Sequence, residues 1–264
     1  MSASPLRLGL RQGRLEIKQF LRSRESVVFT MAFPVIMIVI FASIFRREIG
    51  EGVQFTQYFV TGMIAAGLMT VGFQSLAIQI PIERDKGVLK RYRSTPMPAW
   101  VYFAGKVILV VVITVVETLL LLAVATLYGL ELPSTAAKWV TFGWVSLLGS
   151  TACTLCGIAF SSLPRSGRSA TAVVTPVALV LQFISGVFFV FSELPSWMQR
   201  IAALFPLKWM CQGLRSVFLP ESFAAVEPAG SFELGRVALM LGLWCVIGLV
   251  LAVTTFRWTN SRER

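Results

Sequence analysis

The sequence predicts an all-α integral membrane protein with six transmembrane helices. Hydrophobic residues make up 56% of the 264 residues and charged residues only 14%, whereas soluble domains average roughly 45–50% apolar and about 25% charged residues. Six apolar runs approach or exceed the roughly 20 residues that a helix needs to cross a bilayer. Most of the 24 basic residues lie in the segments on one side of these runs. The length suits a single membrane domain over residues 1–264.

The six predicted spans follow one another with short connections. They are Val27–Phe45, Gln57–Ile80, Val101–Tyr128, Trp139–Leu163, Ala170–Phe191 and Arg236–Phe256. An even number of spans places both termini on the same side. Lys and Arg next to spans are retained in the cytoplasm, so the basic termini and the basic second and fourth loops predict that both termini are cytoplasmic.

Residues 1–26 are predicted to form a cytoplasmic amphipathic helix that lies on the membrane surface. Leu6, Leu10, Gly13 and Ile17 recur at helical spacing. A basic stripe follows the same spacing one residue later: Arg7, Arg11, Arg14 and Lys18. Two roles stay open, namely an anchor bound to anionic lipid and an anchor that also touches a cytoplasmic partner.

The segment 192–235 is predicted to lie on the extracytoplasmic side. Its first part, Ser192–Leu219, is semi-apolar and is interrupted by Pro195 and Pro206. Proline breaks a helix, so we expect short re-entrant or interfacial helices before the last span, and not a seventh span.

The cytoplasmic loop 81–100 is long, carries charges of both signs and ends with Pro96 and Pro98. We expect Gly87 to allow a turn and Val88–Arg93 to form a short helix that stops ahead of Pro96. This pattern suits a docking element, and a plain solvated loop is the alternative.

The same loop carries a family resemblance. The run Glu83-Arg84-x-x-Gly87-Val88-Leu89-Lys90-Arg91-Tyr92-x-x-Thr95-Pro96 resembles the signature loop of type-2 ABC exporter permeases of the drug-resistance-like branch. The resemblance extends to the basic N-terminal helix, the six spans and the stretch before the last span. It implies that the loop is a coupling helix that inserts into an ATPase subunit. The implied contacts are Glu83, Arg84, Gly87, Leu89, Lys90, Arg91 and Arg93.

The resemblance also implies partners. The sequence contains no G-x-x-x-x-G-K-[ST] phosphate-binding loop, so we expect a transport subunit without catalytic residues or a cofactor of its own. ATP and Mg belong to a separate ABC ATPase, present in two copies beside a second permease copy, either identical or a close paralogue. The expected location is the inner membrane of a prokaryote. The chain has no histidine, so no metal site is expected, and topology explains the basic residues without nucleic acid.

Residues inside the spans are candidates for a substrate path. Glu117 lies about 24 Å of helix rise beyond Val101, and a carboxyl group inside the membrane is a functional candidate. It either binds a cationic passenger, lines a wet cavity or is hydrogen-bonded in a structural role, which we favour. The other candidates are Phe59, Met63, Phe73, Gln182, Phe188 and Phe189, although ordinary packing is their simpler interpretation. Lys106 is expected to extend back to the cytoplasmic surface.

The leading hypothesis is the membrane-spanning permease subunit of an ATP-binding cassette exporter that moves an amphipathic drug, antibiotic or lipid outward. A polysaccharide or lipid-linked glycan exporter is the first alternative, although the spans supply few polar residues for a carbohydrate. A non-ATP-dependent channel or membrane scaffold is the alternative from another class. A membrane enzyme is disfavoured, because the chain lacks histidine and paired carboxylates for acid-base chemistry.

Overall fold

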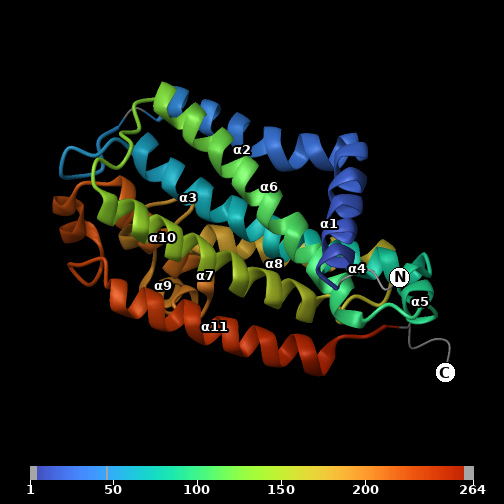
Figure 1. Ribbon diagram of the computed structural model, residues 1–264. Coiled ribbons are helices and arrows are strands. Elements are labelled where there is room, and N and C mark those ends of the chain that lie inside the picture. Colours follow the sequence, from blue (N-terminus) through green and yellow to red (C-terminus); the bar gives the residue numbers. More distant parts are fainter. Residues whose placement is uncertain (1–4, 46, 259–264) are drawn as a thin grey trace.

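The structure is a computed structural model that describes residues 5–45 and 47–258. Long helices run side by side between two ends of a bundle (Figure 1). In the described part, six helices are long and apolar enough to cross a membrane. They are α2 (Arg24–Ile44), the continuous helix α3–η1–α4 (Phe55–Asp85), α6 (Ala99–Leu127), α7 (Ala136–Phe160), α8 (Gly167–Ile184) and α11 (Leu234–Thr255). The predicted all-α fold with six spans is confirmed.

The second span forms the centre of the bundle. It consists of α3 (Phe55–Met69), a π-helical turn η1 (Thr70–Gln74) and α4 (Ser75–Asp85), and it is the most buried of the six. Glycine lets α7 approach η1 closely, because a Cβ on Gly157 would lie 2.7 Å from the carbonyl oxygens of Gly72 and Phe73. Such close backbone contact is how helices associate in lipid, where the hydrophobic effect does not drive them together.

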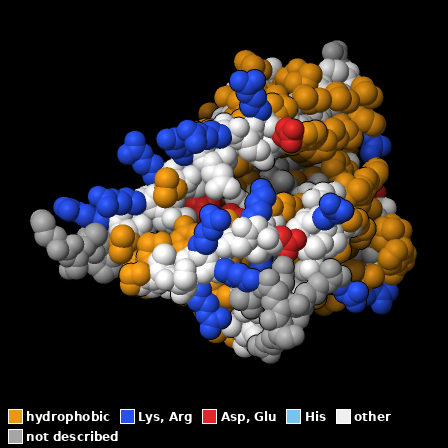
Figure 2. All heavy atoms as spheres, turned by 90° about the vertical axis from the view of Figure 1, so that its right-hand side faces the viewer, with side chains coloured by type: hydrophobic (Ala, Val, Ile, Leu, Met, Phe, Trp, Pro, Cys, Tyr) orange, Lys and Arg blue, Asp and Glu red, His pale blue; other side chains and the backbone are white. Residues whose placement is uncertain are grey.

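One end of the bundle carries α1 (Pro5–Arg22), α5 (Val88–Arg93) and the last turn of α11 (Figure 1). We call it the α5 end. Figure 2 looks onto this end and shows many Lys and Arg side chains with few Asp and Glu, while hydrophobic side chains cover the flank. This arrangement is the one that six crossings and a one-sided basic excess require.

Helix α1 crosses the α5 end at a steep angle to α2 and packs against α6 (Figure 1). Its buried face is made of small and polar residues. A Cβ on Gly13 would lie 2.5 Å from Ile108 of α6, and Gln12 and Glu16 are also buried. Leu10, one of the apolar residues expected to face the membrane surface, is 59% exposed.

The predicted N-terminal helix is present as α1, and its place on the membrane surface stays a prediction. The predicted basic stripe, Arg7, Arg11, Arg14 and Lys18, is exposed. The face of α1 that packs against the protein contains buried Gln12 and Glu16, whereas Leu10 and Leu15 are exposed. Residues 1–4 of the predicted segment lie outside the described residues, as do the side chains of Pro5 and Leu6.

The fifth span ends earlier than predicted, at Ile184 and not at Phe191. Gly186 has a φ of +78°, a left-handed conformation that terminates the helix. The chain then packs against α3, where a Cβ on Gly62 would lie 2.9 Å from the carbonyl oxygen of Val187. The expected apolar continuation of the span is thus a mostly buried segment of turns and bends.

Short helices cover the opposite end of the bundle, between α8 and α11. They are η2 (Phe191–Glu193), α9 (Ser196–Ala202), α10 (Pro206–Phe218) and η3 (Glu221–Val226). Helix α10 is almost wholly buried and contacts α3, α7 and α11. The prediction of several short helices in this segment is confirmed.

Arg215 of α10 fixes these short helices to the spans. Its side chain is 1% exposed, and its guanidinium donates to Gly186 O at 2.6 Å and to Glu227 Oε1 at 3.0 Å. It also lies 4.1 Å from the ring centre of Tyr58. The Tyr58 hydroxyl accepts from the amide of Phe191 at 2.8 Å. A buried arginine with an acidic partner thereby joins α3, the end of α8, α10 and η3.

Replacing Gly186 with alanine is expected to destabilise the fold. The new methyl group would occupy a left-handed backbone position and lie 2.7 Å from Nη2 of Arg215. We expect a loss of roughly 1–3 kcal/mol in the free energy of unfolding, measured on purified protein in detergent. Gly242→Ala is the control, because Gly242 lies in α11 with no atom within 4 Å of the added Cβ. Equal stability of the two variants would contradict this account.

Candidate functional site

The 81–100 loop is folded against the inner ends of the spans. Helix α4 ends at Asp85, Gly87 turns the chain with a φ of +70°, and α5 covers Val88–Arg93 as predicted. The Asp85 carboxylate accepts from the amide of Gly167 at 2.6 Å. That amide begins α8, so the carboxylate also stabilises the helix terminus.

The loop residues divide into an inward and an outward set. Glu83 and Arg84 are each 5% exposed and Leu89 is fully buried. Gly87 is half-buried, and the exposed set is Lys90, Arg91 and Arg93. The seven residues suggested by the family resemblance therefore do not form one surface. In this structure Glu83, Arg84 and Leu89 contact the chain's own helices, which corrects their expected place on a docking face.

A buried ion network explains the position of Glu83. Lys106 Nζ of α6 lies 2.5 Å from Glu83 Oε1 and 2.8 Å from Glu16 Oε2 of α1. The second oxygen of Glu83 accepts from the Tyr102 hydroxyl at 2.8 Å, and Gln12 donates to Glu16 at 2.9 Å. This lysine network joins α1, α4 and α6 at one point.

We expected Lys106 to extend to the surface, but the structure shows that it does not. Its side chain is fully buried, because two carboxylates inside the protein satisfy the ammonium group better than a strained reach to water. A buried charge of this kind is stable only with close partners.

Helix α5 is tied to the lysine network through aromatic contacts. The rings of Tyr92 and Tyr102 lie 5.5 Å apart in an edge-to-face arrangement. Burial, together with the nearby charges of Glu16 and Glu83, raises the pKa of Tyr92 to about 12. Its hydroxyl therefore stays protonated at physiological pH, and the contact does not depend on ionisation.

Arg84 joins a second set of helix ends. Its Nε donates to Arg257 O at 3.0 Å, and both terminal nitrogens lie 3.2 Å from Ser161 O. These carbonyls follow α11 and α7. One arginine thus holds α4, α7 and α11 together directly before α5 begins.

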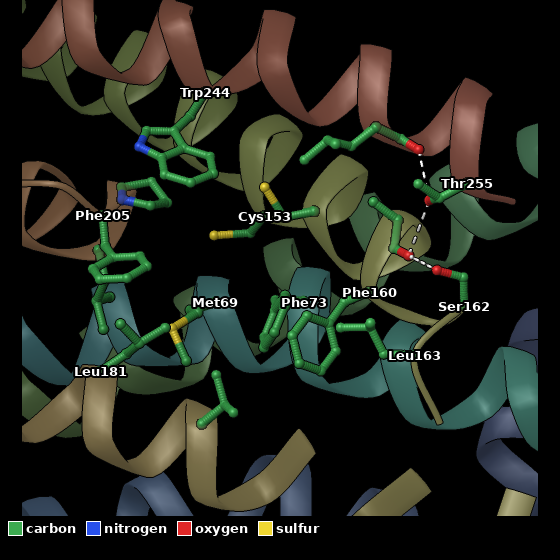
Figure 3. Close-up of a pocket in the computed structure, with 16 residues that line it drawn as sticks. Met69, Phe73, Cys153, Phe160, Ser162, Leu163, Leu181, Phe205, Trp244 and Thr255 are labelled. Carbon is green, nitrogen blue, oxygen red and sulfur yellow. Dashed lines mark hydrogen bonds between the residues drawn. The ribbon is translucent and has the colours of Figure 1, made fainter. Parts of the chain in front are cut away.

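Deeper in the bundle, an apolar cavity of about 370 Å³ lies between α3–η1, α7, α8, α10 and α11 (Figure 3). Figure 3 shows Trp244, Phe205 and Leu181 around one part of it, and Phe160 and Leu163 at the other. The other labelled wall residues are Met69, Phe73, Cys153, Ser162 and Thr255. Its lining is almost entirely apolar, as is typical of sites for hydrophobic ligands.

One known protein family matches most of the chain. The profile of the ABC-2 type transporters matches residues 13–219. The chain belongs to this family. Proteins named inner membrane transport permease YadH, from Escherichia coli K12, E. coli O157:H7 and Shigella flexneri, are each 25% identical to it over 239 residues. The match covers 88% of this chain and 91% of each relative.

Membership of the ABC-2 family makes this chain the membrane component of an ABC transporter. In this family the ATPase is a partner and not the membrane component itself. Among the described residues, no group of three His, Cys, Asp or Glu side chains is placed to hold a metal ion.

The predicted path residues of this ABC-2 transporter do not gather at one site. Phe73 lines the apolar cavity, and Phe189 is 49% exposed. The remaining aromatic, Met and Gln candidates are packed inside the protein: Phe59, Met63, Phe188 and Gln182. Phe59 stacks on Phe41 of α2 with ring centres 4.2 Å apart, which is a helix-packing contact.

Glu117 carries a buried carboxyl group with an oxygen that is unpaired in the described part of the chain. It is 2% exposed, and its Oε1 has no hydrogen-bond partner among the described residues. The carboxyl group fits against Gly67 of α3, where a Cβ would lie 2.7 Å from that oxygen. Glycine at this position provides the space for the carboxyl group.

Sequence reasoning missed the cavity walls supplied by Cys153, Phe205 and Trp244. Each is an ordinary apolar residue in its own segment, and only the packing of five helices brings them together. The nearest sequence signal was the Cys153-x-x-Cys156 pair, because both of these thiols line the cavity.

Removing the buried ammonium is expected to destabilise the lysine network. Lys106→Met would leave Glu16 and Glu83 buried without a cation, which costs roughly 3–5 kcal/mol in the free energy of unfolding. The triple variant Lys106→Met, Glu16→Gln, Glu83→Gln should regain most of that loss, as measured by unfolding in detergent. The control Arg47→Met breaks an exposed ion pair with Glu193 and should cost about 1 kcal/mol or less. A triple variant no more stable than the single one would refute the network.

Proposed function

We propose that this chain is the permease subunit of an ABC exporter in the inner membrane, with the α5 end in the cytoplasm. The ATPase subunit docks on the exposed face of α5. The observation that supports this proposal is that the loop has two faces. Arg91 and Arg93 are exposed on one face, while Leu89 on the other holds the helix to the spans. A helix exposed on one face and anchored on the other can transmit the movement of a partner.

The proposed assembly contains two permease chains and two ATPase subunits. ATP and Mg bind to the ATPase subunits, and their closure moves the two α5 helices. The exposed basic side chains suit an acidic groove on the ATPase, because charge complementarity speeds docking and fixes its orientation. The basic character of the α5 end (Figure 2) supports the cytoplasmic orientation of both termini.

The proposed passenger is an amphipathic drug, antibiotic or lipid. The apolar cavity supports this class, because its walls offer aromatic rings, thioether and thiol groups and very few polar atoms. A polysaccharide or lipid-linked glycan would need many hydrogen-bonding groups along its path. The cavity does not provide them, so glycan export is the second candidate.

Charge reversal on the outer face of α5 is expected to abolish coupling. Arg91→Glu with Arg93→Glu should reduce co-purification of the ATPase and passenger-stimulated ATP hydrolysis at least tenfold, because both arginines are exposed. Arg165→Glu with Arg168→Glu reverses two exposed charges beside the start of α8, at the same end of the bundle, and serves as the matched control. Normal transport by the α5 variant, inserted with correct topology, would overturn the docking proposal.

A screen of compounds that stimulate ATP hydrolysis by the reconstituted complex identifies the passenger.

Glu117→Gln distinguishes a structural carboxyl group from a binding site for a cationic passenger. The amide keeps the shape of a protonated carboxyl group against Gly67, so at least half of the transport rate should remain for every passenger. Transport assays with matched cationic and neutral compounds test this. Loss of cationic transport alone, in a stable variant, would assign Glu117 to the path.

A further inference from the structure

A second cavity, of about 360 Å³, opens at the end of the bundle opposite α5. It lies between η2, α9, α10 and the segment that begins α11. Its polar wall includes Arg200, Lys208, Gln212, Glu233 and Arg236, and its apolar wall includes Phe191 and Trp209. We call it the Lys208 pocket. None of these residues belongs to the coupling loop or to the apolar cavity of Figure 3.

Lys208 is a buried cation without an adjacent counter-ion. It is 7% exposed, and its ammonium group donates to Gln212 Oε1. The same group lies 3.7 Å from the ring centre of Trp209 and 5.4 Å from that of Phe191. An ammonium group has three N–H donors. One amide oxygen and two aromatic faces do not satisfy all three of them.

The nearby carboxylates are engaged elsewhere. Glu227 binds Arg215 at 3.0 Å, and Glu233 binds Arg236 at 2.5 Å. In the described part of the chain, no carboxylate oxygen lies within 4 Å of the Lys208 ammonium. A buried charge is costly unless it is paired, so this pocket suits an anion supplied from outside the chain.

The rim of the pocket adds to this positive charge. Arg200 is exposed, and its Nε donates to the backbone oxygen of Ser196 at 3.4 Å. The Arg236 side chain is 69% exposed. Three cationic side chains therefore face the cavity against one carboxylate, that of Glu233. Arginine and lysine together form the strong charge-assisted hydrogen bonds by which proteins bind phosphate groups.

The height of the pocket along the bundle indicates the source of the anion. Arg236 lies in the first turn of α11, where this helix enters the membrane. Exposed Trp197 of α9 is a residue typical of the membrane surface. Lipid head groups occupy this level, and the cavity is larger than a free phosphate ion and has two aromatic walls.

We propose that the Lys208 pocket binds the phosphate head group of an anionic phospholipid. Its placement in the outer leaflet rests on the orientation proposed above, but binding itself does not. Lys208 is the buried contact of the phosphate, and Arg200 and Arg236 are the contacts at the rim.

The test measures lipid binding by native mass spectrometry of the purified full chain in detergent. Phosphatidylglycerol is compared with zwitterionic phosphatidylcholine and with inorganic phosphate as a competitor. We expect phosphatidylglycerol to bind at least tenfold more tightly than phosphatidylcholine, and Lys208→Gln to remove this preference. Because Lys208 is buried, the rim variant Arg200→Gln with Arg236→Gln provides a second test, with an expected loss of at least fivefold and no change in unfolding temperature.

Arg47→Gln is the control, since Arg47 is an exposed basic residue outside the pocket. Unchanged lipid preference in both pocket variants would overturn the proposal. Equal loss in the Arg47 control would also overturn it, because the effect would then reflect overall charge. Displacement of the lipid by inorganic phosphate at low millimolar concentration would assign the pocket to the free ion instead. Because the assay needs no ATPase, its failure is distinguishable from failure of the exporter proposal.

Binding should also depend on pH. Burial lowers the pKa of Lys208 to about 8, although Glu227 and Glu233 oppose this shift, while Arg215 adds to it. The neighbouring Cys211 thiol, whose pKa burial raises to about 11, stays neutral below pH 9. Lys208 is charged below its pKa and neutral above it, so lipid affinity should fall by up to about fivefold between pH 8 and pH 9. Affinity that stays constant over this range in the wild type would contradict the role of Lys208.

Discussion

The burial of Lys106 between two carboxylates is the interaction on which the α5 end depends. An ammonium group in an apolar interior requires close acidic partners, and these come from α1 and α4. The position of α5 follows, because its first residue lies only three positions after the end of α4. The direction of α1 follows as well, since Glu16 must turn toward α6. One lysine thus determines how α1, the second span and the 81–100 loop meet.

The opposite end depends on a second buried cation. Arg215 binds Glu227, Gly186 and the face of Tyr58, and so positions the segments between α8 and α11. Between these two polar ends, the helices touch through glycine and apolar side chains. Such contacts are weak individually and lack direction. The structure therefore combines two ends held by directional polar contacts with a middle held by apolar packing and close glycine contacts.

Hydropathy predicted the six spans because lipid demands long apolar helices, and Gly87 with Pro96 predicted α5 because both act locally. The predictions that were wrong failed because they depend on contacts between residues far apart in the sequence. Lys106 was treated as a lone lysine near the surface, but its partners lie 23 and 90 positions away in the sequence. The fifth span ends at a glycine whose carbonyl group binds an arginine 29 positions later. The cavity of Figure 3 likewise combines residues that are unremarkable in their own segments. Composition and local pattern do not contain such distant pairings.

The corrected placement of the loop residues sharpens the proposed mechanism. A helix that only bound an ATPase would move without moving the spans, because an exposed loop absorbs displacement. Transmission requires a second face that binds the permease itself. Leu89 and Tyr92 supply that face through apolar packing and a ring contact with Tyr102, whose hydroxyl donates to Glu83 of α4. The resemblance grouped inward and outward residues because both occur in one short sequence motif. Under the proposed mechanism, the outward residues would receive the force from the ATPase, and the inward residues would pass it to α4 and α6.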